Sequence, residues 1–261
     1  MQALKFRLSG KTAIFKRPDV NVHCLFTYSH IHKPALLGIL GAICGFAGYN
    51  SQKAHNDRCI AEKRKTDILD YPEFYEKLKD IKVAIIPEKP TFVTKIQTQN
   101  NSVGYANYDP QSGGMTLCFS EQWLEEPSWE IFVLLDGSEV TEELKRRFLA
   151  RKFVYIPYLG KNDHFADITD IEIVDLTEVS ECSRVRSMIF ADKVVKFVDK
   201  LSNPFKPNPV NYFKYAERLP IALDREDNMY ELRKFVYTNM DVTLNDYDFV
   251  YSCNAGNIAF F

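Results

Sequence analysis

This sequence lacks most of the signatures by which enzymes and metal proteins are recognised. It has no HExxH, no GxSxG and no glycine-lysine phosphate loop, which excludes the common sites of zinc proteases, serine hydrolases and nucleotide hydrolases. Its six cysteines are scattered without a CxxC pair, so we expect a reduced, cytoplasmic chain with no disulfide framework, no metal and no cofactor. The longest apolar run is about 14 residues, whereas a membrane span needs roughly 20, so we expect no membrane segment.

Acidic residues are scarce in the first quarter of the chain. Residues 1–65 hold 11 Lys and Arg against three Asp and Glu, a net charge of +8, which leaves −10 for the remaining 196 residues. This distribution predicts a basic face for a polyanion and an acidic remainder suited to a protein neighbour. The simpler alternative is that the charges only solvate surface strands.

Glycine is concentrated in one apolar stretch, residues 36–47, for which we predict a helix. The glycines here are three, four and three residues apart, so they fall on one side of a helix. They are Gly38, Gly41, Gly45 and Gly48. One interpretation is a core helix packed tightly on a sheet. The other is a backbone-lined surface for a phosphate chain, with Lys33 and the helix N-terminus facing it.

The hydrophobic pattern of residues 1–158 predicts an α+β domain. Besides the glycine helix it indicates short helices after Asp70 and Ser138, and strands at 3–8, 81–86, 92–96, 129–135 and 153–158. This order matches a ferredoxin-like (RRM-like) domain. A polar, turn-rich segment between two strand-like flanks predicts an inserted, projecting hairpin at about residues 97–114. Residues 50–66 show no hydrophobic period and are predicted to be a basic loop.

Beyond residue 158 the pattern changes to short strand-like pieces separated by turns. They lie at 171–176, 184–190, 219–223, 230–237, 248–252 and 258–261. Residues 192–201 are ambiguous, because their valines favour a strand while their period favours a helix. Residues 159–261 therefore predict a smaller, mostly antiparallel β domain packed on the first.

Three of the five histidines, His23, His30 and His32, precede the glycine helix beside basic residues. An acid and a base of this type can cleave RNA without a metal, so one alternative is a metal-independent endoribonuclease. The interpretation we favour is that these histidines cap backbone or contact phosphate. Asp163 and His164 are adjacent, so their side chains diverge on an extended chain, and we do not expect them to act as a dyad.

Three segments together resemble one known family. The opening LKFRLSGKTAIFKRPDVNV, the helix KPALLGILGAICGF and the loop PYLGKNDHFADI are similar, in this order, to the CRISPR-associated Cas five family of the repeat-associated protein (RAMP) superfamily, type I-B branch. The resemblance spans residues 4–168. It implies a non-catalytic, RNA-binding subunit of the Cascade surveillance complex of antiviral defence. Such a subunit caps the 5′ handle of the CRISPR guide RNA (crRNA) and bridges the large subunit and the backbone subunit.

The resemblance also implies which residues meet RNA. The hairpin corresponds to the family's thumb, where aromatic and amide side chains would stack on bases or hydrogen-bond to them. They are Gln97, Gln99, Asn100, Tyr105 and Tyr108. A glycine-containing loop would meet phosphate through Gly160, Lys161 and Asn162. A sequence-independent grip would come from N-terminal cations. They are Lys5, Arg7, Lys11, Lys16, Arg17 and Lys33.

Two features of the family are missing or open. One branch, in type I-C systems, cuts precursor RNA with a tyrosine, lysine and histidine set that has no convincing counterpart here. The aromatic RNA-recognition signature K/R-G-F/Y-G/A-F-V-x-F/Y is also missing, so RNA contact should not depend on it. A third alternative is a purely structural subunit whose glycine helix packs on protein and touches no RNA.

Overall fold

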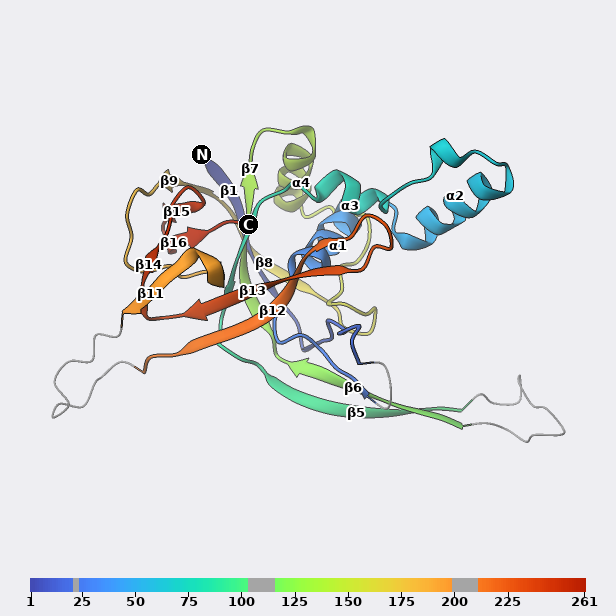
Figure 1. The fold of residues 1–261 in the computed structure, drawn as a ribbon, viewed down its shortest axis with the longest axis horizontal. Coiled ribbons are helices and arrows are strands. Elements are labelled where there is room, and N and C mark those ends of the chain that lie inside the picture. Colours follow the sequence, from blue (N-terminus) through green and yellow to red (C-terminus); the bar gives the residue numbers. More distant parts are fainter. Residues whose placement is uncertain (21–23, 103–115, 199–210) are drawn as a thin grey trace.

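The computed structural model describes residues 1–20, 24–102, 116–198 and 211–261. The fold is mixed α and β, with its strands in several sheets that are antiparallel almost throughout (Figure 1). The central sheet has the order β4 (Val83–Pro87), β7 (Ser128–Leu135), β1 (Gln2–Ser9) and β8 (Asp167–Asp175). The predicted strands at 3–8, 81–86 and 129–135 are thus confirmed. Because β8 lies beyond residue 158, it completes the sheet from within the predicted second domain, and the boundary itself stays a prediction.

The side chains of β1 alternate between two covered faces. Leu4, Phe6 and Leu8 are fully buried in a cluster shared with α1 (Lys33–Cys44), α3 (Glu73–Leu78) and α4 (Glu139–Ala150). The ring of Phe6 lies 4.6 Å from that of Phe148 in α4. The opposite face packs on the last two strands, β15 (Val250–Cys253) and β16 (Gly256–Ala259). Apolar burial on both faces makes this sheet the centre of the core.

Helix α1 begins and ends where its own residues dictate. His32 is the N-cap, and its Nδ1 accepts a hydrogen bond from the backbone N–H of Ala35 at 3.3 Å. Gly45 ends the helix in the left-handed conformation, with φ of 82°. At Gly41 a Cβ would lie 2.5 Å from the Cβ of Phe74, so the absence of a side chain lets α3 approach closely. The prediction of a tightly packed core helix is confirmed at this position.

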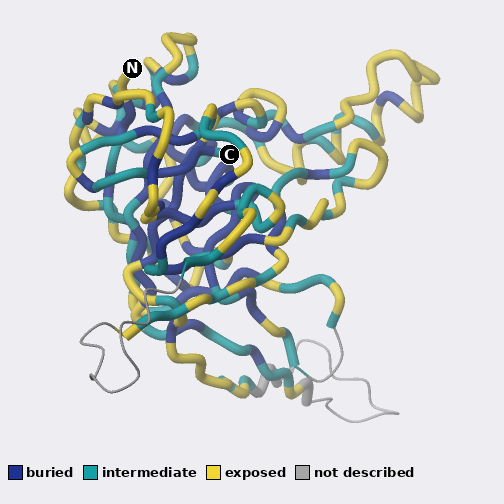
Figure 2. Tube along the Cα trace, turned by 60° about the vertical axis from the view of Figure 1, so that its left-hand side comes forward, coloured by how far each residue is buried: buried dark blue, intermediate teal, exposed yellow. Residues whose placement is uncertain are grey.

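The prediction of a loop at residues 50–66 is wrong. Most of this stretch is α2 (Tyr49–Ala61), followed by a 3₁₀ turn at Lys65–Asp67. The helix extends away from the body (Figure 1), and Cys59 is its one buried residue. Figure 2 shows the contrast with the buried centre of the molecule. Because α2 packs on no apolar surface of its own, its sequence carries no hydrophobic stripe. Asn56 holds it instead, with side-chain hydrogen bonds to the backbone of Leu69.

A second sheet carries the long hairpin. β5 (Val93–Ser102) and β6 (Thr116–Glu125) pair antiparallel along their full length and extend away from the body (Figure 1). Two short strands also pair with β6, β2 (Thr12–Ala13) antiparallel and β3 (Cys24–Leu25) parallel. The predicted strand at 92–96 is confirmed as the start of β5.

The described residues after β8 form three small antiparallel sheets, as the sequence predicts. One contains β10 (Ile189–Phe190), β13 (Tyr230–Thr238) and β12 (Lys214–Leu223). Another pairs β11 (Val194–Val198) with β14 (Asp241–Leu244), and the third adds β9 (Thr177–Glu178) to β15 and β16. The ambiguous segment 192–201 is a strand where described, after a 3₁₀ turn at Ala191–Lys193. Of the strand predicted at 184–190, only β10 forms.

Within the described ranges, no single helix combines the length and the apolar character of a membrane span. The pair α1 and α2 meets the criteria together, but the chain bends by 85° between them.

Candidate nucleic-acid interface

The two cations of β1 are engaged with carboxylates. The ammonium of Lys5 lies 2.7 Å from a carboxylate oxygen of Glu172 and 3.9 Å from one of Glu130. The guanidinium of Arg7 lies 2.9 Å from Asp170 and 3.5 Å from Glu88. These acids come from β8, β7 and the turn after β4. A phosphate at this face would have to compete with carboxylates already in place, so the structure does not favour Lys5 and Arg7 as RNA contacts.

Lys33 is turned inward, contrary to the prediction that it faces a phosphate chain. Its side chain is buried, and the ammonium donates a hydrogen bond to the carbonyl of Phe261 at 3.3 Å. Burial lowers the pKa of Lys33 to about 8. This lysine ties the start of α1 to the last residue of the chain.

Three predicted cations lie between β1 and β3. Lys11 is exposed and lines a small surface hollow together with Lys89, Glu125 and Glu126. Arg17 forms two hydrogen bonds with Asp19 and lies over the ring of Tyr28. Lys16 is exposed, and among the described residues no carboxylate lies within ion-pair distance of its ammonium. Lys16 is therefore the best placed of the three to meet a phosphate.

The predicted glycine-containing loop is fixed to the hairpin. Lys161 lies 3.2 Å from a carboxylate oxygen of Glu121 on β6 and 3.1 Å from Asp163. Glu121 is buried and also accepts a hydrogen bond from the indole of Trp123. Lys161 thus neutralises a buried carboxylate, and this need accounts for its position without RNA.

The two neighbours of Lys161 differ in role. Gly160 has φ of 88°, and a Cβ there would lie 1.8 Å from the carbonyl oxygen of Ile14. Only glycine lets this loop pass so close to the chain before β3. Asn162 is exposed and free to meet solvent or a ligand.

The hairpin residues are only partly described. Gln97 and Gln99 are half-buried on β5, opposite Glu121 and Phe119 of β6. Asn100 continues β5, opposite Cys118. Tyr105 and Tyr108 lie outside the described residues, so stacking by these two tyrosines stays a prediction.

His30, one of the three histidines of the endoribonuclease alternative, is enclosed in the core. His30 is fully buried; its Nε2 lies 2.9 Å from the carbonyl of Pro90, and its Nδ1 accepts a hydrogen bond from the indole of Trp129 at 3.4 Å. Burial lowers its pKa to about 4. A base with both nitrogens engaged inside the protein cannot reach a ribose hydroxyl. His23 lies outside the described residues.

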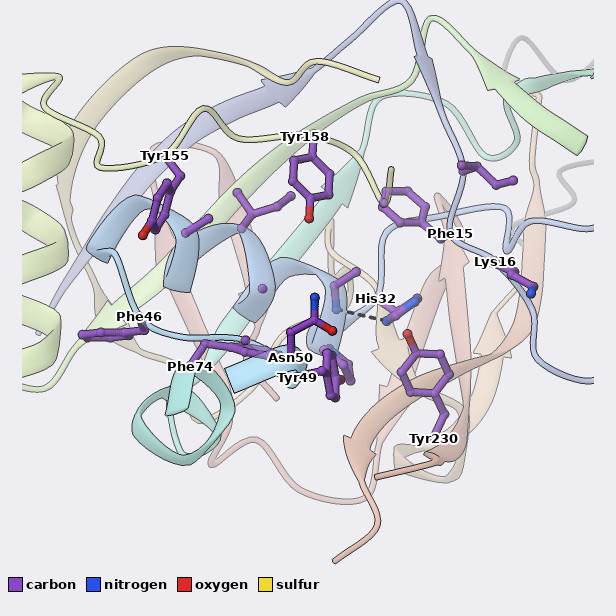
Figure 3. Close-up of a pocket in the computed structure, with 18 residues that line it drawn as sticks. Phe15, Lys16, His32, Phe46, Tyr49, Asn50, Phe74, Tyr155, Tyr158 and Tyr230 are labelled. Atoms are coloured by element: carbon purple, nitrogen blue, oxygen red, sulfur yellow. Dashed lines mark hydrogen bonds between the residues drawn. The ribbon is translucent and has the colours of Figure 1, made fainter. Parts of the chain in front are cut away.

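A larger cavity lies beside α1 and is lined in part by Gly38 and Gly48, two of the glycines for which a backbone-lined surface is one interpretation, although Lys33 does not line it. It has a volume of about 680 Å³, and two of the predicted RNA-binding residues, Lys16 and Gly160, line it. Figure 3 shows α1 between the loop of Tyr155 and Tyr158 on one side and Phe74, Tyr49 and Asn50 on the other. Its end is closed by a further group of rings. They are Phe15, His32 and Tyr230.

Sequence reasoning missed these tyrosines because residues 153–158 were predicted to be a strand. The prediction is wrong: the backbone N–H groups of Val154 and Tyr155 donate to the carbonyls of Ile43 and Ala42 at the end of α1. This docking leaves Tyr155 58% and Tyr158 45% exposed. The available signal was a dense group of aromatic residues directly before the glycine-containing loop.

No family model and no curated protein matches this chain. Solved structures do. A chain described as "CRISPR RNA-guided surveillance complex" aligns over 93% of this chain and 91% of its own length, with 13% identity and a TM-score of 0.52. A CRISPR protein from Archaeoglobus fulgidus aligns over 99% and 98%, with 10% identity and a TM-score of 0.45. The first of these establishes a likeness of fold that extends over nearly the whole of both chains.

Proposed function

We propose that this chain is a non-catalytic, RNA-binding subunit of a type I CRISPR surveillance complex that caps the 5′ handle of the crRNA. The observation that carries the proposal is the order of its elements. Strand, helices, two strands, helix and strand build a sheet in which β1 and β7 are central and β4 and β8 are the edges. This order is consistent with a ferredoxin-like arrangement, in which we propose β5 and β6 as the thumb. The fold likeness to a surveillance-complex chain supports it.

Resemblance in three segments adds the type I-B assignment and the partners. As in that family, the backbone and large subunits are the protein neighbours we propose, with crRNA bound between them. The acidic balance of residues 66–261 suits a surface that meets protein rather than nucleic acid. Catalysis by this chain has the weaker support, since His30, on which the endoribonuclease alternative depends, is buried with both ring nitrogens occupied.

The experiment that tests RNA binding is a salt titration with the full chain and a single-stranded RNA. Affinity should fall linearly in log salt, with a slope of about −0.7 for each phosphate neutralised. Replacing the two exposed lysines between β1 and β3, Lys11→Glu with Lys16→Glu, should make that slope shallower. The matched control is Lys234→Glu, an exposed lysine on β13. RNA binding that is absent in the parent chain, or a slope unchanged by the pair, contradicts the proposal.

A further inference from the structure

The cavity beside α1 has aromatic walls that the fold does not explain. Tyr155, Tyr158 and Tyr49 are each about half exposed, yet all three line the same space (Figure 3). Folding normally hides such rings, and apolar surface left open together in one place marks a binding site. The volume of about 680 Å³ is in the range of small-ligand sites.

Along α1, the floor of the cavity carries few long side chains. Ala35, Gly38 and Ala42 lie on one face of α1 and none carries a side chain beyond Cβ, while Pro34 and Ile39 also line the cavity. Packing demands a glycine at Gly41, but not at Gly38. A Cβ at Gly38 would have only the ring of Phe74 nearby, at 4.0 Å. The open floor therefore leaves room for a planar group along the helix.

A buried donor faces this space. His32 is 2% exposed and lines the cavity. Because its Nδ1 accepts the Ala35 N–H, the ring proton is on Nε2. Among the described residues no group accepts a hydrogen bond from this Nε2–H. This nitrogen is not among the buried polar atoms that lack a partner, so it is open to the cavity, where an acceptor oxygen or nitrogen of a ligand can meet it.

The charges at the cavity suit an anionic ligand. Lys16 lies at its rim, and none of the described lining residues is acidic. Aromatic walls, an N–H donor that opens on the cavity and one cation together suit an unstacked base with its phosphate. An aromatic side chain of a partner protein would use the walls but leave the cation and the donor without a role.

We infer that this cavity holds one unstacked nucleobase of a single-stranded RNA, with the tyrosines against its faces, His32 Nε2–H on an acceptor at its edge and Lys16 on the adjoining phosphate. The inference rests on the proposed function and deepens it. It adds a pocket for one base to the backbone grip and the base-contacting thumb that the resemblance implies.

The test uses the full chain and eight-nucleotide single-stranded RNAs that carry 2-aminopurine at one position at a time. Fluorescence should be quenched strongly at one position, because only one base enters the cavity. Gly38→Leu fills the cavity floor and favours the helix, so this variant should fold, lose that quenching and bind roughly tenfold more weakly. Ala150→Leu adds the same side chain to an exposed position on α4 and should change nothing.

Tyr158→Leu is the second variant, for use if Gly38→Leu does not fold. It should also lose the quenching, since the stacking face is gone. Wild-type affinity and single-position quenching that survive both substitutions overturn the cavity site, leave RNA binding intact and point to a protein side chain as the occupant. If the parent chain binds none of the RNAs at low salt, the proposed function fails first and this inference falls with it.

Discussion

The cations of β1 and Lys16 at the cavity beside α1 all come from the basic first quarter of the chain, yet their surroundings in the fold are opposite. Lys5 and Arg7 are matched to carboxylates supplied by later strands, Glu130, Asp170 and Glu172. The cavity keeps Lys16 without a carboxylate within ion-pair distance among the described residues, and its other polar groups are neutral. Net charge along a sequence therefore overstates the charge offered to a ligand, because folding pairs opposite ends of the chain.

Lowering the pH should destabilise the region around the cavity and the start of α1, and this is the largest effect we expect. The pKa of His30 is lowered to about 4 and that of His32 to about 3, both by burial. Their neutral forms contribute fully to stability above the unfolded value near 6.5. That contribution is lost as the pH falls toward the folded values, because the unfolded chain binds the proton first. Between pH 7 and pH 5 each histidine should cost roughly 2 kcal/mol.

Urea unfolding at the two pH values measures this loss. His32→Asn keeps an N-cap and removes one titrating ring, so the difference between the two pH values should shrink by about half. An equal loss in parent and variant would show that His32 is not the group responsible.

Gly38 and Gly160, two of the glycines that line the cavity, should respond differently to alanine. Gly160→Ala places a Cβ 1.8 Å from the Ile14 carbonyl oxygen at positive φ and should destabilise the chain by about 3 kcal/mol or more. Gly38→Ala has room and should stabilise α1 by up to about 1 kcal/mol. Denaturant midpoints of the two variants give the comparison. Similar destabilisation of both would mean that the cavity floor is a packed surface.

Lys161 tests whether the glycine-containing loop is structural. Lys161→Met leaves the buried Glu121 carboxylate without its nearest cation. Because Lys161 is about one-third exposed, we expect a loss of only about 1–2 kcal/mol. Adding Glu121→Gln should restore most of that stability. If the double variant recovers stability but still binds RNA poorly, Lys161 meets phosphate as well.

The smallest effect is expected on the β1 face. Lys5→Ala and Arg7→Ala remove exposed ion pairs worth about 0–1 kcal/mol each. They should leave the salt dependence of RNA binding unchanged, in contrast to Lys16→Glu. If the salt dependence of RNA binding becomes shallower in either alanine variant, RNA binds at the β1 face of the central sheet.

Sequence patterns predicted the parts of this chain that pack on a core. β1, β7 and α4 have clear apolar periods because each buries one face or both. Helix α2 has almost no buried side, so it offered no period to read. Residues 153–158 form a short apolar run typical of a strand, but the N–H groups of Val154 and Tyr155 donate to carbonyls at the end of α1.

The candidate site was only partly within reach of the sequence. Lys16 and Gly160 were predicted and line the cavity, whereas Tyr155 and Tyr158 were missed. The ion pairs of Lys5 and Arg7 could not be predicted from the sequence either, since their partners lie far along the chain. A sequence shows which residues can carry charge or stack, and only the fold shows which of them remain available.

The most direct measurement is ultraviolet crosslinking of a bound single-stranded RNA to the purified full chain in EDTA, mapped residue by residue by mass spectrometry. We predict intact RNA with crosslinks at Tyr155, Tyr158 and Lys16, and none on the β1 face. RNA cut at a unique bond, or crosslinks that avoid the cavity and the hairpin altogether, would contradict the account.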